Sequence, residues 1–281
     1  IRKFPSVIKD EKLDYLVCHD QWAGLACYYT HRKHNIPYSV FIHEKLSNYS
    51  LPILGKIATD LERKALFNAE KVFAVTDKVG NTITNKYPEL KGKVIPNYPG
   101  MELKREIKPY EERENAILSV SMWDRGRKPE LYLEIASSLP KYNFIMAGNW
   151  RIKELKEEFV EKIKEKGVKN LTLREGLSEN ELSGMYSKSK FLLRFGFGEY
   201  GLATAVTEAI SNGTPVIVNK DLGTAELVNE NNAGVVVDDP LDSINAIVEN
   251  DNEKRYKSML EGVRRVTEKY SWSAHAKKLL L

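Results

Sequence analysis

The chain of 281 residues has few cysteines and no long apolar run. Its two cysteines, Cys18 and Cys27, form neither a C-x-x-C pair nor a zinc-ligand pattern. Because Cys18 lies in an apolar segment, we expect it to be buried and reduced, as in a cytoplasmic protein without a disulfide framework. No apolar run approaches the roughly 20 residues that span a bilayer, and no secretory signal peptide opens the chain. The first residue is Ile1 rather than methionine, so we expect the chain to be shortened at its start.

Several catalytic motifs are also missing. There is no Gly-x-x-x-x-Gly-Lys loop and no Gly-x-Ser-x-Gly elbow. No Asp-x-Asp lies between the expected strands, which disfavours a metal-dependent single-domain transferase, and we expect neither a metal ion nor a cofactor. The net charge is only +4, and basic residues alternate with acidic ones along the expected helices. A nucleic-acid partner is therefore disfavoured.

Short apolar runs alternate with amphipathic stretches along most of the chain. Strands are expected at 13–18, 38–42, 71–75 and 93–95, and again at 116–120, 144–147, 171–173, 191–193, 215–218 and 234–237. Strands that alternate with helices imply βαβ units and a parallel sheet. The pattern predicts an α/β protein with two Rossmann-like, doubly wound domains.

The alternation is interrupted once, which sets the expected domain boundaries. Residues 96–100 form a Pro- and Gly-containing turn, and residues 101–114 are polar and aperiodic, so we interpret 101–114 as a linker. Residues 1–100 would form an incomplete N-terminal domain, residues 115–270 a complete C-terminal domain and residues 271–281 a final helix.

The strongest local signal is a glycine-rich loop between a strand and a helix, over Phe195–Ala203. Glycines allow the backbone to approach a ligand closely, and free N–H groups at the start of a helix can hold an anion. Glu208 lies within the following helix, where a buried carboxylate needs a partner such as the hydroxyls of a ribose. The alternative is a tight structural turn followed by a surface glutamate.

A second signal is a basic loop that follows the strand at 116–120. It holds Arg125, Arg127 and Lys128 just before a helix. Arginine and lysine at this edge of a parallel sheet suit a diphosphate leaving group, whose developing charge they can stabilise. The alternative is an exposed basic turn.

The run from Glu208 to Val216, Glu-Ala-Ile-Ser-Asn-Gly-Thr-Pro-Val, resembles the nucleotide-sugar loop of the large retaining glycosyltransferase family 4, which has the two-Rossmann-domain (GT-B) fold. The resemblance extends through residues 115–281. It implies that residues 115–270 bind the nucleotide sugar, that residues 1–100 lie on the acceptor side and that residues 271–281 form a helix that packs back on the N-terminal domain. It also implies that Glu208 binds the ribose, that Lys128 with Arg125 or Arg127 binds the diphosphate, and that the backbone of Gly201, Leu202 and Ala203 faces it. Gly148 would lie at the donor site, where the family ends its second strand.

The family usually places another glutamate eight residues before Glu208, but this chain has Tyr200 there and Glu199 one residue earlier. We expect Glu199 to contact the transferred sugar in its place. In the first half, Phe41-Ile-His43 is similar to the family's Thr-x-His, so His43 would face the sugar and the acceptor. His19 and Asp20 are further candidates.

The resemblance implies transfer of a sugar from a UDP- or GDP-linked donor to a hydroxyl acceptor, with retention and without a metal. The acceptor would be a glycan or a lipid-linked molecule. The apolar stretch Asn48–Leu54 either touches such an acceptor at the inner membrane face or packs in the core or the cleft. Two alternatives stay open on the sequence: a nucleotide-sugar epimerase on the same scaffold, and a non-catalytic subunit that binds nucleotide sugars.

Overall fold

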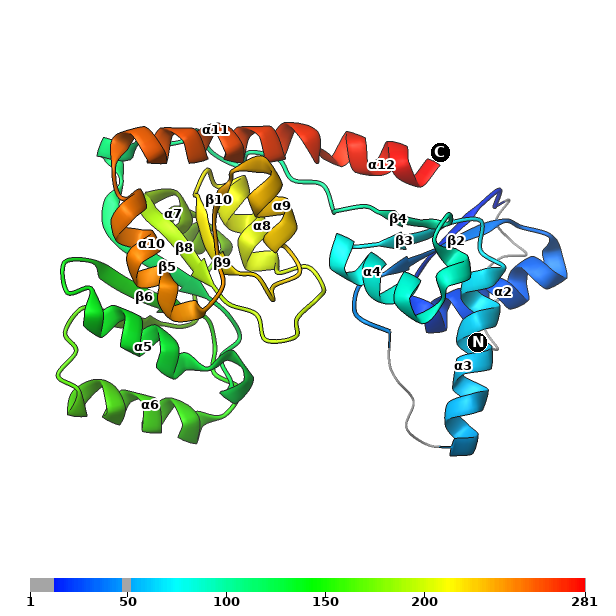
Figure 1. The fold of residues 1–281 in the computed structure, drawn as a ribbon, viewed down its shortest axis with the longest axis horizontal. Coiled ribbons are helices and arrows are strands. Elements are labelled where there is room, and N and C mark those ends of the chain that lie inside the picture. Colours follow the sequence, from blue (N-terminus) through cyan, green and yellow to red (C-terminus); the bar gives the residue numbers. More distant parts are fainter. Residues whose placement is uncertain (1–12, 47–51, 281) are drawn as a thin grey trace. The chain divides into compact units, whose positions relative to one another are not determined.

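The protein divides into two compact units in a computed structural model, which describes residues 13–46 and 52–280. Unit 1 comprises residues 1–99, 200–202 and 275–281, and unit 2 comprises residues 100–199 and 203–274. Both units are built on parallel sheets, so the predicted α/β class with two Rossmann-like domains is confirmed (Figure 1). Each unit is described by itself.

Unit 2 has a six-stranded parallel sheet in the order β10-β9-β8-β5-β6-β7. The strands, in chain order, are β5 (Glu114–Val120), β6 (Asn143–Ala147), β7 (Leu171–Arg174), β8 (Ser189–Arg194), β9 (Val216–Asn219) and β10 (Gly234–Val237). The central strand β8 is buried along its whole length, and its middle residues Phe191–Leu193 are apolar.

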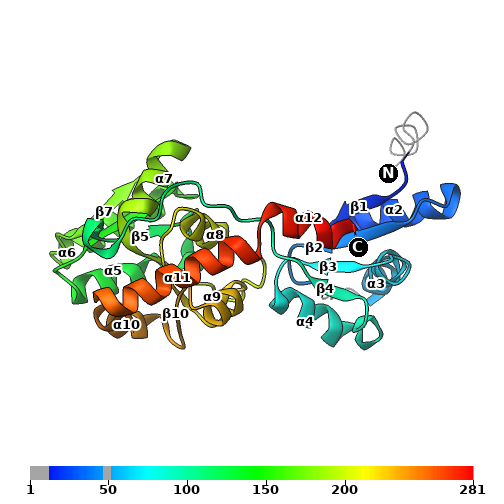
Figure 2. The same cartoon turned by 90° about the horizontal axis from the view of Figure 1, so that it is seen from above.

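Helices cover both faces of this sheet. One group, in which α10 contacts α5 and α5 contacts α6, comprises α5 (Pro129–Ser138), α6 (Lys153–Glu165) and α10 (Ser243–Asn250). The other, in which α8 contacts both α7 and α11, comprises α7 (Glu179–Lys188), α8 (Thr204–Ser211), α9 (Ala225–Asn231) and α11 (Glu253–Lys269). Figure 2 shows α11 running across α8 and α9. Helices on both faces of a parallel sheet make unit 2 doubly wound.

Unit 1 has a four-stranded parallel sheet whose order, β1-β2-β3-β4, follows the sequence. Its elements are β1 (Leu16–His19), α2 (Asp20–His34), β2 (Tyr38–Ile42), α3 (Pro52–Phe67), β3 (Val72–Ala74), α4 (Asp77–Lys86) and β4 (Val94–Pro96). Because the strand order advances in one direction and crossovers are right-handed, α2, α3 and α4 share one face of the sheet. The last helix, α12 (Trp272–Leu280), is counted with unit 1 from His275 onward.

The two cysteines lie near each other in unit 1. Cys18 at the end of β1 and Cys27 in α2 are both buried, and the structure joins them by a disulfide with their Cα atoms 6.7 Å apart. Burial of Cys18 was predicted correctly, but the expectation that it is reduced is wrong. The sequence shows no C-x-x-C pattern because the bond connects a strand end to the second turn of the next helix.

Two apolar residues near the start of α3 are exposed, although packing in the core was one of the expectations for Asn48–Leu54. Ile53 and Leu54 are 76% and 64% exposed, so core packing is wrong for these two, while residues 48–51 lie outside the described part of the chain. Among the described residues, no helix is both long and apolar enough to cross a membrane.

Candidate functional site

The strand order of unit 2 places a switch point between β5 and β8. From β5 the chain moves to β6 and β7 on one side, and then continues from β8 to β9 and β10 on the other. In open parallel sheets, ligands bind outside the carboxyl ends of the strands at the point where the order reverses. The loops that follow β5 and β8 are the two that the sequence singles out, and they lie at this edge.

The loop after β5 is held in place by a buried tryptophan and a capping aspartate. Trp123 is fully buried, and its indole nitrogen donates to the carbonyl of Ala147 at 3.0 Å. The carboxylate of Asp124 accepts from the backbone N–H of Arg127 at 3.1 Å and caps a short 3-10 helix over Arg125–Arg127. Lys128 follows with a φ of +48° and lies directly before α5. The basic loop is therefore fixed at both ends by the fold.

The loop after β8 is tied to the next strand by Asn219 at the end of β9. The side chain of Asn219 accepts from the N–H of Gly196 and donates to its carbonyl, both at 2.8 Å. Further along, the carbonyl of Glu199 accepts from the N–H of Gly223 at 2.8 Å. These bonds hold Phe197 and Glu199 at the carboxyl edge of the sheet.

Glu199 links the two loops through a pair of arginines. One carboxylate oxygen accepts from Arg194 Nη2 at 2.7 Å, and the other pairs with Arg127 Nη1. Arg194 is the last residue of β8 and its side chain is 6% exposed, whereas the side chains of Arg127 and Glu199 are 26% and 31% exposed. Burial lowers the pKa of Arg194, although an arginine keeps its charge at neutral pH.

Arg194 is a functional candidate that the sequence analysis missed. Its Nη1 is buried without a hydrogen-bond partner in the described part of the chain. The available signal was a charged residue at the end of the apolar run Phe191–Leu193, since a buried charge needs a partner. That partner, Glu199, is the residue we expected to contact the sugar.

The other two cations of the basic loop differ in their surroundings. The ammonium of Lys128 lies 3.9 Å from the centre of the Phe197 ring, so it meets the loop after β8 by a cation–π contact. The guanidinium of Arg125 is 77% exposed and pairs with Glu158 of α6 at 3.8 Å. The structure therefore brings Arg127 and Lys128 to the switch point and turns Arg125 toward α6.

Glu208 lies on α8, the helix that follows the glycine-rich loop. Its Oε2 accepts from the hydroxyl of Tyr186 at 3.0 Å, while its Oε1 has no hydrogen-bond partner among the described residues. Tyr186 is fully buried in α7, and burial followed by the charge of Glu208 raises the pKa of this phenol. Tyr186 stays protonated and fixes the carboxylate, which leaves one oxygen to accept from a ligand hydroxyl.

The backbone positions expected at the donor site have different roles. Gly148 has a φ of +112°, and a Cβ there would lie 1.9 Å from the carbonyl oxygen of Ser121. The N–H of Gly148 already donates to the carbonyl of Arg174 at 2.9 Å. A glycine is therefore needed at this position because the loop after β6 packs closely against Ser121 in the loop after β5. Ala203 directly precedes α8, whose first N–H groups lack helical partners. Gly201 and Leu202 are counted with unit 1.

His43 lies in unit 1, directly after β2. Its Nε2 is 2.7 Å from Nδ1 of His19, which ends the neighbouring strand β1, and its backbone N–H donates to the carboxylate of Asp20 at 3.2 Å. Burial lowers the pKa of His43, and the nearby charge of Asp20 opposes this while His19 adds to it. The structure therefore brings all three histidine and aspartate candidates of unit 1 together.

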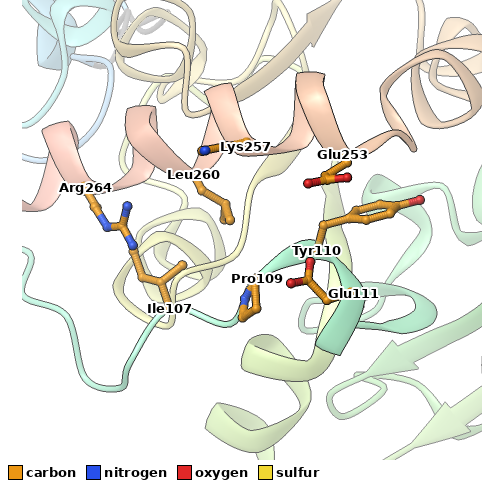
Figure 3. Close-up of a pocket in the computed structure, with 8 residues that line it drawn as sticks. All are labelled: Ile107, Pro109, Tyr110, Glu111, Glu253, Lys257, Leu260 and Arg264. Carbon is orange, nitrogen blue, oxygen red and sulfur yellow. The ribbon is translucent and has the colours of Figure 1, made fainter.

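A separate cavity lies on the opposite edge of unit 2. It has a volume of about 240 Å³ and is formed between residues 107–111 and α11 (Figure 3). Its lining includes Tyr110, four residues before the start of β5, so it lies near the amino end of that strand and holds none of the expected site residues. In the described ranges, 13–46 and 52–280, no group of three or more His, Cys, Asp or Glu is arranged to hold a metal ion.

Comparison with known families identifies the fold and the class of activity. The sequence profile of the glycosyl transferases group 1 matches residues 101–264, and that of glycosyltransferase family 4 matches residues 1–98. The chain belongs to the glycosyl transferases group 1. It is a glycosyltransferase that uses a nucleotide sugar, which decides against the epimerase that the sequence alone leaves open. No curated protein matches it in sequence.

Solved structures share the GT-B fold at low sequence identity. Anabaena Alr3699/HepE in complex with UDP matches with a TM-score of 0.78 and 12% identity, over 99% of this chain and 80% of that one. A glycosyltransferase from Rickettsia africae matches with a TM-score of 0.78 and 16% identity, over 99% and 78% of the two chains. Sucrose-phosphate synthase from Thermosynechococcus elongatus matches with a TM-score of 0.75 and 16% identity, over 99% of this chain and 74% of that one.

Proposed function

We propose that this glycosyltransferase transfers a sugar from a UDP- or GDP-linked donor to a hydroxyl acceptor, with retention of the anomeric configuration and without a metal ion. The observation that carries the proposal is the meeting of Arg127, Lys128 and Glu199 at the switch point of unit 2. Anabaena Alr3699/HepE, which shares the fold, has been solved with UDP and with UDP-glucose.

In this proposal, the donor is held by residues of unit 2. Arg127 and Lys128 bind the diphosphate and stabilise the charge that develops on it as the bond to the sugar breaks. The first N–H groups of α8, after Ala203, bind the same anion, since the amino end of a helix carries a partial positive charge. Glu208 accepts a hydrogen bond from a ribose hydroxyl through its free Oε1, while Tyr186 holds its Oε2.

Glu199 and His43 are proposed to act on the transferred sugar. Glu199 accepts hydrogen bonds from sugar hydroxyls, and His43 interacts with the sugar and the acceptor from unit 1. No residue is assigned as a nucleophile, because the family is thought to react on one face of the sugar. The leaving phosphate then helps to remove the proton of the acceptor hydroxyl.

A lipid-linked acceptor has more support than a free glycan. Ile53, Leu54 and Ile57 of α3 are all more than half exposed, and they are spaced to share one side of the helix. An exposed apolar group of this kind suits contact with lipid. This would place the enzyme peripherally at a membrane surface.

The donor site is tested by thermal unfolding with UDP, GDP, UDP-glucose and GDP-mannose. A ligand at about 100 times its Kd adds about 2.7 kcal/mol to the stability of the state that binds it. We expect one base to raise the midpoint of the wild type and Glu208→Ala to abolish the increase. Glu157→Ala, on the exposed face of α6, is the matched control and should retain it. If no nucleotide stabilises the folded wild type, the donor-site assignment is wrong.

A further inference from the structure

The strand ends of unit 1 carry a contact between two imidazoles that no assigned role explains. Nδ1 of His19 lies 2.7 Å from Nε2 of His43, within hydrogen-bonding distance. The two rings are stacked with their planes 18° apart, and each also stacks on Phe41. Three aromatic rings thus fix the orientation of the pair.

The backbone explains why the rings meet. β1 and β2 are parallel neighbours, with His19 in register with Phe41, so His43 lies two residues beyond that register position, on the same side. Asp20 follows His19 with a φ of +67°, a conformation that costs a residue with a side chain about 1 kcal/mol or more. Its carboxylate accepts from the N–H of His43, which adds a second link between the two strand ends.

The geometry restricts the hydrogens of the pair. A neutral imidazole carries one N–H, and the 2.7 Å contact uses one N–H and one lone pair. If His19 donates, His43 must hold its own hydrogen on Nδ1, and if His43 donates, its Nδ1 is an acceptor. The tautomers of His43 and His19 are therefore coupled through this contact.

We propose that His19 is a positioning residue that fixes the ring orientation of His43 and couples the tautomer of His43 to its own. The inference rests on the proposed role of His43 in sugar transfer. Because Nε2 of His43 is engaged by His19, Nδ1 is the nitrogen left to interact with the substrate. His19 acts through His43, and it does so by the contact between Nδ1 of His19 and Nε2 of His43.

Among the described residues, the charged or titratable groups beside the pair include Asp20 at the start of α2, Glu44 and Lys45 after His43, and His275 of α12, whose ring packs on Phe41. His275 is turned toward the carbonyl of Tyr98, 3.0 Å from its Nδ1. Burial lowers the pKa of His43 most, Asp20 opposes this, and the charge on His19 lowers it further, so neutral substitutes for His19 should raise the pKa of His43.

Three variants of His19 separate positioning from simple packing. The side-chain amide of asparagine reaches the place of Nδ1, glutamine reaches that of Nε2, and alanine reaches neither. We expect His19→Asn to retain kcat within about threefold. His19→Ala and His19→Gln should lose about tenfold or more in kcat with little change in the donor KM, since small misplacements of a reacting group are costly.

The assay is release of UDP from UDP-glucose, or of GDP from GDP-mannose, followed against pH. The pH at which activity falls on the acid side should move upward in His19→Asn, together with the pKa of His43 measured by ring NMR. His31→Asn, on α2 and away from the pair, is the control and should change neither. Equal activity of all three His19 variants with an unchanged profile would overturn the proposal.

The two proposals can fail separately. If wild-type protein binds no nucleotide, the proposed function fails, but NMR still tests the imidazole contact through the pKa of His43 in His19→Asn. An unchanged pKa of His43 in that variant would show that the two rings do not interact in solution. If the wild type transfers sugar and only the His19 predictions fail, the role of His19 alone is refuted.

Discussion

In the proposed donor site, Glu199 and the diphosphate share the guanidinium of Arg127. Arg127 pairs with one oxygen of Glu199, and Arg194, which is far more buried, holds the other. A diphosphate that takes the Nη1 hydrogen of Arg127 would displace this carboxylate, whereas Arg194 can keep it in place. Donor binding would then free one oxygen of Glu199 for the sugar at the moment when Arg127 turns to the phosphates.

Substitution of Glu199 should therefore affect the nucleotide and the sugar in opposite directions. In Glu199→Gln the amide oxygen can still accept from Arg194, but the ionic contact with Arg127 is lost. The pair is about 30% exposed, so we expect release of about 1 kcal/mol and a roughly fivefold tighter binding of free UDP or GDP. Transfer should fall, because the charged acceptor of the sugar hydroxyls is gone. Calorimetric titration and an activity assay measure the two effects.

Arg125 supplies the control for that experiment. Because it pairs with Glu158 on the surface, Arg125→Gln should leave nucleotide affinity nearly unchanged. Weaker binding in this variant, or unchanged binding in Glu199→Gln, would contradict the division of roles among the three cations of the loop.

At the residue level, the sequence points to candidate site residues and misses those that hold them in place. Arg127, Lys128 and Glu208 could be proposed because their charge stands out beside a strand end or a glycine-rich loop. Tyr186 and Asn219 could not, because their partners lie 22 and 23 residues away in the sequence and meet them only in the folded unit. Arg194 was missed although its partner Glu199 is only five residues away. Glu199 was proposed as a sugar ligand, but its two arginines were not foreseen.

Gly148 illustrates how tightly two elements meet at the carboxyl edge. In Gly148→Ala the new methyl group would overlap the carbonyl of Ser121, and alanine would also have to adopt the unfavourable φ of +112°. We therefore expect a loss of more than about 3 kcal/mol in the free energy of unfolding. Gly167 also has a positive φ, +63°, but open space around it, so Gly167→Ala should cost only about 1 kcal/mol. Urea unfolding distinguishes the two, and equal losses would refute the packing argument.

The start of α11 is fixed by a buried polar network centred on Asp251. Its carboxylate accepts from Lys190 at 2.5 Å, from Tyr142 at 2.6 Å and from Tyr110 at 2.9 Å. Burial by itself would raise the pKa of Asp251, but these bonds outweigh it and hold the pKa below the ordinary value of 3.8. The network connects β8 with the segment before β5 and with α11.

Asp251→Asn should destabilise unit 2 by about 3 kcal/mol at neutral pH, because it leaves the ammonium of Lys190 buried without its counter-ion. A carboxylate whose pKa is lowered by folding stabilises the fold fully when the pH is above its pKa in the unfolded chain. This stabilisation is lost as the pH falls through its pKa in the folded protein. The difference in stability between wild type and variant should therefore shrink below about pH 4. Chemical unfolding at several pH values measures it, and a constant difference would contradict the assignment.

Most strands and helices could be predicted, but their ends could not. The expected strand at 13–18 is observed as β1 over Leu16–His19, and α2 begins directly after it, at Asp20. The reason is local: the positive φ of Asp20 turns the chain directly into α2, which periodicity cannot show. The capping box of α7, by contrast, is local enough to be recognised from the sequence, because Ser178 and Glu181 lie within four residues.

At the scale of the whole molecule, the disulfide offers a way to perturb one unit alone. It closes a loop of 9 residues between β1 and α2, which corresponds to about 2–3 kcal/mol in the chain-entropy account. Reduction should speed amide exchange in β1, α2 and β2 and leave exchange in the sheet of unit 2 unchanged. Hydrogen exchange with and without a reductant checks this, and Cys27→Ser should match the reduced wild type.

The alternation of strands and helices was sufficient to predict two parallel α/β domains. It was not sufficient for the strand order, since nothing in the sequence of β8 says that it returns beside β5 instead of β7. That order depends on which apolar faces can be buried together, and it creates the switch point at which the basic loop and the glycine-rich loop meet.

The reciprocal bonds between Asn219 and Gly196 also bear on how this enzyme could be redesigned. They extend the hydrogen bonding between β8 and β9 by one further pair of bonds, made by a side chain, so the sheet in effect extends to Gly196. Changes at Gly196 or Asn219 would disturb the sheet itself. A library of variants intended to alter sugar preference should therefore start at Phe197, the first residue beyond these bonds, where substitutions do not disturb the pairing of β8 with β9.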